Sequence, residues 1–292
     1  VNDYGNDIQP NVLWRNDGPK PDGSWAFVDI SIRSGANVPM FGMGLAVGDY
    51  DLDGSLDLFI TNISDSVLLR NSGEGLRFTD TASTAGVGIG SVVGEERVAW
   101  GTVFFDYDND GDEDLYVVSG YLRLPAEFVI YELPRHILEQ PNVLLENGGF
   151  GTFSDISPES GVNDRGIGRG VAFLDVDNDG CLDLFIVNLG QKAKLFHNIC
   201  QSRNAWLTVK TEGTISNRDG IGARITVSAN GTTQIREIAS GSSQMGQNMM
   251  AAHFGLGEAT SIDSITIKWP SGIVQTLTDL TVNQRLTVTE PK

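Results

Sequence analysis

Short apolar stretches alternate with turns throughout the first 200 residues of the chain. The stretches are rich in β-branched and aromatic side chains and are bounded by Asn, Asp and Gly, a pattern typical of strands joined by tight turns. Between Val1 and Asn188 the sequence lacks the periodicity of a long amphipathic helix. We therefore expect an all-β structure here.

Three segments align without gaps: AVGDYDLDGSLDLFITN from Ala46, VFFDYDNDGDEDLYVVS from Val103 and AFLDVDNDGCLDLFIVN from Ala172. Self-similarity at intervals of roughly sixty residues predicts an array of equivalent units. Each segment is followed by a second shared piece, seen as VLLRNSGEGLRFTD, as NVLLENGGFGTFSD and, shortened, as AKLFHN. One unit thus reads as four short antiparallel strands, which predicts the blade of a β-propeller.

The pattern changes after Cys200. Runs such as WLTVKT, ARITVSA, DSITIKWP and RLTVTE alternate apolar and polar residues and are separated by turns. Strict alternation predicts half-buried antiparallel strands. We expect an all-β chain with two domains: partial β-propeller blades over residues 1–200 and a small β-sandwich over residues 201–292.

The aspartate loops share the form D-x-D-x-D-G-x-x-D. Ca²⁺ prefers six to eight oxygen ligands, and a turning backbone can aim the carboxylates at positions 1, 3 and 5 at one centre. Glycine at position 6 permits the bend, and the position 7 carbonyl and position 9 carboxylate complete the shell. The predicted ligands of the three Ca²⁺ sites are Asp49, Asp51, Asp53, Ser55 and Asp57; Asp106, Asp108, Asp110, Asp112 and Asp114; and Asp175, Asp177, Asp179, Cys181 and Asp183.

Other interpretations of these loops fit less well. An EF-hand needs a Glu at position 12, where the three loops have Ile60, Val117 and Ile186. Mg²⁺ rarely accepts a cage made only of protein ligands. Plain aspartate-rich turns would leave four carboxylates in mutual repulsion, so we expect calcium.

Charge and hydropathy narrow the class of protein. The chain carries 38 acidic against 20 basic residues, a net charge of −18, which disfavours nucleic-acid binding. It has no apolar run long enough for a transmembrane segment. It begins with Val1 and without a basic-plus-apolar leader, so we expect a mature or trimmed chain. Calcium loops of moderate affinity fill reliably outside the cell, which favours a secreted, extracellular protein.

The two cysteines, Cys181 and Cys200, have two interpretations. Cys181 precedes a predicted strand and Cys200 follows the next strand of the same hairpin. A disulfide is therefore expected in an oxidising compartment, and a pair of buried free thiols is the alternative.

The chain starts in the middle of a predicted blade. Val1-Asn2-Asp3 aligns with the ITN and IVN that end later second strands, and NVLWRNDG aligns with third strands. Three explanations of this incomplete blade are open. Upstream blades exist in the intact protein; or a strand from another copy completes the sheet and propagates a filament; or the late strand at 194–198 closes a small ring.

A long apolar insertion, YLRLPAEFVIYELPRHILEQ, interrupts the second unit between Gly120 and Pro141. We expect it on one face, where it either packs over a neighbouring blade or contacts a partner. It contains His136, the histidine that stays open as a catalytic candidate. His197 stands at a variable position of the repeat, and His253 is expected to be structural.

The loops and their flanks, such as GLAVGDYDLDGSLDLFITN, resemble FG-GAP/VCBS repeats, the calcium-binding blades of integrin-like propellers. SNRDGIGARITV, REIASGSSQMGQN, HFGLGEA and IDSITIKWPSG resemble the ASPIC/UnbV domain. The repeats followed by this domain, in this order, resemble the cartilage acidic protein family. The resemblance implies a calcium-bearing propeller and an extracellular, matrix-associated role.

Three classes of function follow. The first is a secreted, calcium-binding structural or adhesion protein, not an enzyme, that contacts an extracellular protein or glycan. The second is a self-assembling filament or surface-layer subunit that associates through the incomplete N-terminal blade. The third is a calcium-dependent extracellular enzyme; the sequence has no G-x-S-x-G, H-E-x-x-H or phosphate-loop motif in its favour.

Overall fold

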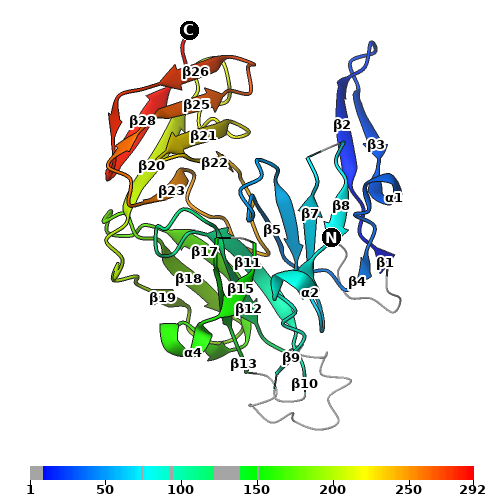
Figure 1. The fold of residues 1–292 in the computed structure, drawn as a ribbon. Helices are drawn as coiled ribbons and strands as arrows, with labels where there is room; N and C mark the ends of the chain where they lie inside the picture. The colour runs from blue at the N-terminus through cyan, green and yellow to red at the C-terminus, as the bar shows by residue number, and fades with distance from the viewer. Residues whose placement is uncertain (1–8, 74, 93–94, 122–138, 150) are drawn as a thin grey trace.

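The computed structural model describes residues 9–73, 75–92, 95–121, 139–149 and 151–292. Blade-like sheets lie side by side between the N-terminal hairpin and the C-terminal strands (Figure 1). The prediction of an all-β chain with partial propeller blades and a C-terminal β-sandwich is confirmed. No helix in the described ranges has the length and hydropathy needed to cross a bilayer.

Each aspartate repeat forms one antiparallel sheet in the order of the chain. The first blade is β5 (Leu45–Gly48), β6 (Asp57–Ile60), β7 (Val67–Asn71) and β8 (Phe78–Asp80). The second is β11 (Ala99–Phe105), β12 (Asp114–Ser119), β14 (Val143–Asn147) and β15 (Phe153–Asp155). The third has three strands: β17 (Gly168–Leu174), β18 (Asp183–Asn188) and β19 (Lys194–Phe196).

The inner strand β11 packs against β5 and against β17, and β11 and β12 are buried along their whole length. Apolar side chains such as Phe59, Phe104 and Leu115 fill the space between the first two blades. The backbones approach so closely that a Cβ at Gly44 would clash with the Trp100 carbonyl oxygen. The Thr61 hydroxyl bonds that same oxygen at 2.6 Å.

A short helical turn follows the fourth strand of each complete unit and also follows the N-terminal hairpin. These turns are α1 (Ser31–Ser34), α2 (Ala82–Ala85) and α4 (Ser157–Ser160). Each ends at a glycine in the left-handed region, where a side chain would be strained: Gly35, Gly86 and Gly161, with φ of 80°, 80° and 74°. The hairpin of β2 (Trp14–Pro19) and β3 (Trp25–Asp29) is thus the second half of a blade, as the sequence predicts.

This half-blade is open. Within the described residues, β2 pairs with β3 and with no other strand, and Trp14, Trp25 and Phe27 are 58%, 59% and 55% exposed. The explanation in which 194–198 closes a ring is wrong, because among the described strands β19 pairs only with β18, and β2 and β3 pair only with each other. Val1-Asn2-Asp3, and positions 122–138 of the insertion with His136, lie outside the described residues.

Short ladders of two-residue strands connect these sheets. They are β1 (Gln9–Pro10) with β4 (Pro39–Met40), β9 (Ser91–Val92) with β10 (Glu95–Glu96), β13 (Gln140–Pro141) with β16 (Arg165–Gly166), and β24 (Ser261–Ile262) with β27 (Leu280–Thr281).

The C-terminal strands form two sheets around a core of their own, which includes Leu207, Ile225, Phe254 and Trp269. One sheet is β23 (Ala252–Gly257), β20 (Ala205–Glu212) and β28 (Gln284–Thr289). The other is β22 (Thr232–Glu237), β21 (Arg224–Ala229), β25 (Ser264–Lys268) and β26 (Val274–Leu277).

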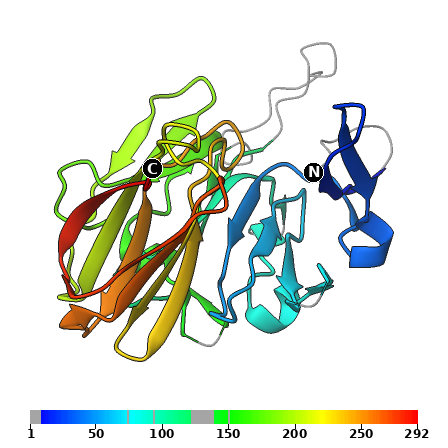
Figure 2. The same cartoon turned by 90° about the horizontal axis from the view of Figure 1, so that it is seen from above.

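The expectation of purely antiparallel strands in this part is wrong for one pair, since β20 and β28 are parallel. Alternation along a strand reports which face is buried and not the direction of its neighbour. Between β20 and β28 the chain forms the four strands of the other sheet, as well as β23. Figure 2 shows these C-terminal strands, coloured yellow-green to red, on the side away from the N-terminal hairpin.

One carboxylate near the C-terminus fastens a loop of the sandwich. Glu290 accepts hydrogen bonds from the backbone amides of Thr214, Ile215 and Ser216 at 2.9, 2.8 and 2.7 Å. The Ser216 and Ser271 hydroxyls bind its other oxygen. Burial alone would raise the pKa of Glu290, but these donors outweigh it and lower the pKa to about 2.

We expect Glu290→Gln to lower the thermal stability of the chain at pH 7. Because the folded pKa lies below its ordinary value of 4.5, the carboxylate stabilises the fold fully above pH 4.5, and this contribution is lost as the pH falls toward 2. The difference in melting temperature should therefore shrink with acidity. Thermal unfolding of wild type, Glu290→Gln and the exposed control Glu258→Gln at several pH values tests this; a pH-independent difference would contradict it.

Candidate metal centres in the aspartate loops

Each aspartate loop connects the first strand of a blade to the second. Position 1 follows directly on the inner strand, and position 9 begins the next strand: Asp57 pairs with Gly48, Asp114 with Phe105 and Asp183 with Leu174. The loop is thus held between two strands that are already hydrogen-bonded. Its ends are fixed before any ligand is considered.

The structure brings three carboxylates of each loop together. Their oxygens lie within 4.8 Å of one another in the groups Asp49, Asp51 and Asp53; Asp106, Asp108 and Asp114; and Asp175, Asp177 and Asp183. Two of the fourth predicted carboxylates, Asp57 and Asp110, lie outside these groups, and Asp179 lies instead in a group with Asp177 and His197. At position 7, the amides of Ser55, Asp112 and Cys181 donate to the position 5 carboxylates at 2.9, 3.1 and 2.9 Å.

The glycine at position 6 has the role that the sequence predicts. Gly54, Gly111 and Gly180 have φ of 84°, 108° and 91°, and each amide donates to the position 1 carboxylate at 3.0 to 3.2 Å. Position 4 is left-handed as well, at Leu52, Asn109 and Asn178, with φ of 56°, 61° and 64°. Asn in two of the three loops was the available signal, because Asn tolerates this region well.

An asparagine at or just after the end of each third strand is hydrogen-bonded to the loop and braces it. Sequence reasoning missed this residue. The amides of Asn71, Asn147 and Asn198 donate to the position 9 carboxylates at 2.7, 2.9 and 2.8 Å. The side chains of the last two also donate to a carbonyl of the preceding loop, Tyr50 at 2.8 Å and Tyr107 at 2.6 Å. The shared N in RN, EN and HN of the repeats is the signal that could have found them.

Burial disfavours the ionised form of these carboxylates. It raises the pKa of Asp49 to about 6 and that of Asp57 to about 8, where the other loop carboxylates add to the effect. Burial also raises the pKa of Asp106 and Asp114 well above the ordinary value. Such a group is stabilised in its ionised form by a nearby positive charge, so the loops favour a bound cation.

Several loop oxygens have no hydrogen-bond partner within the described part of the chain. They are Asp57 Oδ2, Asp51 Oδ1 and Asp112 Oδ1, all buried. A buried carboxylate oxygen without a partner costs free energy. Hard oxygen donors with free lone pairs fit Ca²⁺, which takes carboxylate and carbonyl oxygens. The residues present therefore fit the predicted ion.

Two sequence profiles of known protein families match parts of this chain. Residues 49–117 match the sequence profile of the FG-GAP-like repeat, and residues 213–292 match the one described as ASPIC and UnbV. The chain combines an FG-GAP-like repeat with an ASPIC and UnbV segment. The resemblance seen in the sequence is confirmed.

Over nearly its whole length the chain is also similar to cartilage acidic protein 1. The protein of Xenopus tropicalis is 27% identical over 279 residues, 93% of this chain and 39% of that protein. Those of Homo sapiens and Mus musculus are 27% identical over 275 and 277 residues, 91% of this chain and 38% and 39% of theirs. The chain thus spans about two fifths of the length of these relatives.

The ASPIC and UnbV segment packs on the second loop. Asn109 at position 4 is 1% exposed. Its side-chain oxygen lies 2.6 Å from His253 Nε2, and its carbonyl accepts the Gly257 amide at 2.9 Å. Burial lowers the pKa of His253 to about 3, so the imidazole is neutral and its Nε2–H donates to Asn109. His253 is therefore structural, as expected.

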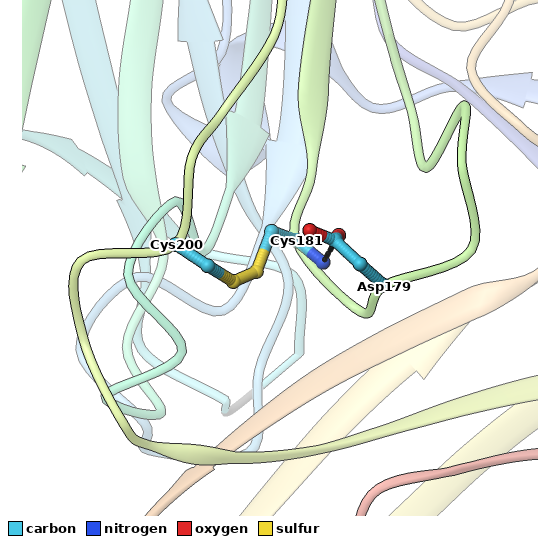
Figure 3. Close-up of side chains that lie close together, drawn as sticks. All are labelled: Asp179, Cys181 and Cys200. Carbon is cyan, nitrogen blue, oxygen red and sulfur yellow. Dashed lines mark hydrogen bonds between the residues drawn. A yellow bond between two sulfur atoms is a disulfide. The ribbon is translucent and has the colours of Figure 1, made fainter.

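The third loop is held by the same segment and by a disulfide. Arg285 of β28 contacts the buried Asp175 carboxylate at 3.1 Å, and Asn109 Nδ2 donates to the Gly180 carbonyl at 3.0 Å. Cys181 and Cys200 are bridged, with Cα atoms 5.9 Å apart, and Cys181 N donates to Asp179 (Figure 3). The disulfide prediction is confirmed, and the alternative of free thiols is wrong.

We expect Asn109→Gly to destabilise the chain by roughly 1–3 kcal/mol, because it leaves buried partners without their hydrogen bonds while glycine accepts the left-handed φ. Asn178→Gly is the matched control, since Asn178 has the same loop position and φ but is exposed. Denaturant unfolding of both variants measures the difference. Equal stability of the two variants would contradict the role of Asn109.

Proposed function

We propose that this protein is a secreted calcium-binding protein whose three loops hold Ca²⁺ for structural reasons. The observation that carries the proposal is the convergence of three carboxylates in each loop, together with a buried Asp51 oxygen that has no hydrogen-bond partner among the described residues. When bound, the ion supplies the positive charge that these carboxylates lack. The disulfide supports an oxidising, extracellular location, where calcium is abundant.

We propose a binding role and not catalysis. The exposed strand faces at the two ends of the row of blades offer surface for an extracellular protein or glycan. The described histidines support this proposal: His253 is buried and neutral, and His197 is hydrogen-bonded to Asp177, a proposed calcium ligand. The similarity to cartilage acidic protein 1 also favours an extracellular role.

Removing calcium should destabilise the chain. At a free calcium concentration one hundred times the dissociation constant, each site contributes about 2.7 kcal/mol, so excess chelator should lower the melting temperature clearly. Calorimetric titration of the metal-free chain should count three sites. An unmoved unfolding curve with chelator would contradict the proposal.

Loss of a single ligand should remove a single site. Asp114→Ala deletes the position 9 carboxylate of the second loop and should reduce the count from three to two. Because Asp114 also accepts the Tyr107 and Asn147 amides, Asp108→Asn is the second variant, which removes charge and keeps shape. The exposed Asp263→Ala should leave the count at three, and an unchanged count in both loop variants would reject the ligand assignment.

A self-assembling subunit is the second candidate, and the two open ends of the row of blades favour it. β19 has a neighbour on one side only among the described strands. The outer face of the third blade exposes Phe185, Val187 and Leu195 by 41%, 44% and 47%. At the other end the β2–β3 half-blade exposes its tryptophans. Two apolar ends of different shape suit a head-to-tail contact between copies.

Assembly predicts a species larger than one chain in calcium. Leu195→Lys and Phe27→Lys should each return it to the monomer, because a charge in an apolar contact is costly. Light scattering coupled to size exclusion measures the mass. Val274→Lys, at a position 62% exposed on the sandwich, is the control and should not change it; a monomeric wild-type chain at high concentration would exclude this candidate.

A further inference from the structure

One position of the third strand stands beside the aspartate loop of its own blade. In each blade the leucine after the position 9 aspartate pairs with a residue of the third strand, and the adjacent position is the next residue along the chain. The asparagine that donates to the position 9 aspartate comes directly after it. The residues at this adjacent position are Arg70, Glu146 and His197, a cation, an anion and an imidazole.

In the first loop this residue already supplies a positive charge. Arg70 Nε donates to Asp51 Oδ2, and its Nη2 donates to Asp53 Oδ2 at 3.0 Å. The guanidinium therefore engages positions 3 and 5 at once. These carboxylates are two of the proposed calcium ligands, and a planar fork of donors suits them.

In the second loop the same position has the opposite charge. The Glu146 carboxylate accepts a hydrogen bond from the Tyr107 hydroxyl at 2.6 Å. Glu146 also lines one cavity together with Tyr107 and Asp108 of the second loop, so its charge lies beside the position 3 carboxylate. Glu146 thus adds negative charge to a loop that is already acidic.

In the third loop the position carries His197, whose Nε2 lies 3.0 Å from Asp177 Oδ2. The first two loops therefore form the clearest contrast. In the described part of the chain, each of them has a buried carboxylate oxygen without a hydrogen-bond partner: Asp57 Oδ2 in the first and Asp112 Oδ1 in the second. The exposed fractions of these residues are 0% and 5%. They differ in the sign of the charge beside them.

We propose that this adjacent position sets the calcium affinity of each loop, so that the second loop binds Ca²⁺ more tightly than the first. The inference rests on the proposed calcium binding and adds an order of filling to it. Arg70 opposes the ion in two ways: it repels a second positive charge, and it holds the carboxylates of positions 3 and 5. Calcium affinity in loop sites follows the ligand charge, and one unit charge at contact distance corresponds to roughly a tenfold change or more.

Calorimetric titration of the metal-free chain with calcium chloride, with variants that assign each step, tests the proposal. Asp57→Ala should remove a weaker binding step than the one that Asp114→Ala removes. Arg70→Gln should strengthen, about tenfold, the step that Asp57→Ala removes. Glu146→Gln should weaken the step that Asp114→Ala removes.

Two further variants separate charge from structure. Arg70→Lys keeps the positive charge and should leave the first loop weak. Arg15→Gln is the matched control, because Arg15 forms an exposed pair with Asp17 in the β2–β3 hairpin and contacts no loop. It should change no step. Circular dichroism establishes that each variant is folded.

The outcomes are distinguishable. Three-site binding in which Arg70→Gln leaves every step unchanged overturns this inference and leaves the proposed function standing. Loss of the tightest step in Asp57→Ala also overturns it. A wild-type chain that binds no calcium overturns the proposed function, and this inference with it.

Discussion

The repulsion among buried carboxylates at the inner end of each blade is the constraint on which the rest of this structure depends. Asp49, Asp106 and Asp175 follow directly on the innermost strands, where packing of the blades removes them from water. Backbone amides of the loop partly compensate, as the Gly54, Gly111 and Gly180 amides do. Amides alone leave net negative charge in a poorly solvated place, which is costly. The cation proposed for each loop would offset this charge while the blades stay packed.

The loops also connect parts of the chain that are far apart in sequence. Asn147 and Asn198 each join their own loop to the loop before it, so neighbouring blades share hydrogen bonds at this end of the sheets. Asn109 then joins the second loop to the third and to His253 of the ASPIC and UnbV segment. A disturbance at one loop is therefore felt by the next blade and by the C-terminal sandwich.

Much of this fold could be predicted from the sequence because its information is local. The nine-residue aspartate pattern fixes where two strands begin and end, and alternation in β21 and β25 identifies half-buried strands. The same reasoning placed Cys181 and Cys200 at adjacent strand ends. In the loops it identified the position 6 glycine and the carboxylates that converge.

What the sequence did not reveal depends on contacts between distant segments. His253 was identified as structural, but its partner Asn109 lies 144 residues away, and no local pattern pairs them. The bracing asparagines stand within a recurring motif, yet their role needs the register of the third strand against the loop. The parallel neighbour of β20 was missed because alternation is the same for either strand direction.

The pairing of β20 with β28 has a consequence for folding during synthesis. A blade needs only neighbouring stretches of chain, so each can form soon after it leaves the ribosome. β20 by contrast joins a partner strand, β28, in which each residue follows its partner by 77 positions. Its apolar face, with Leu207 and Val209, must therefore wait exposed while the other strands of the sandwich are made. During this interval the unpaired edges of β20 are open to non-native strand pairing.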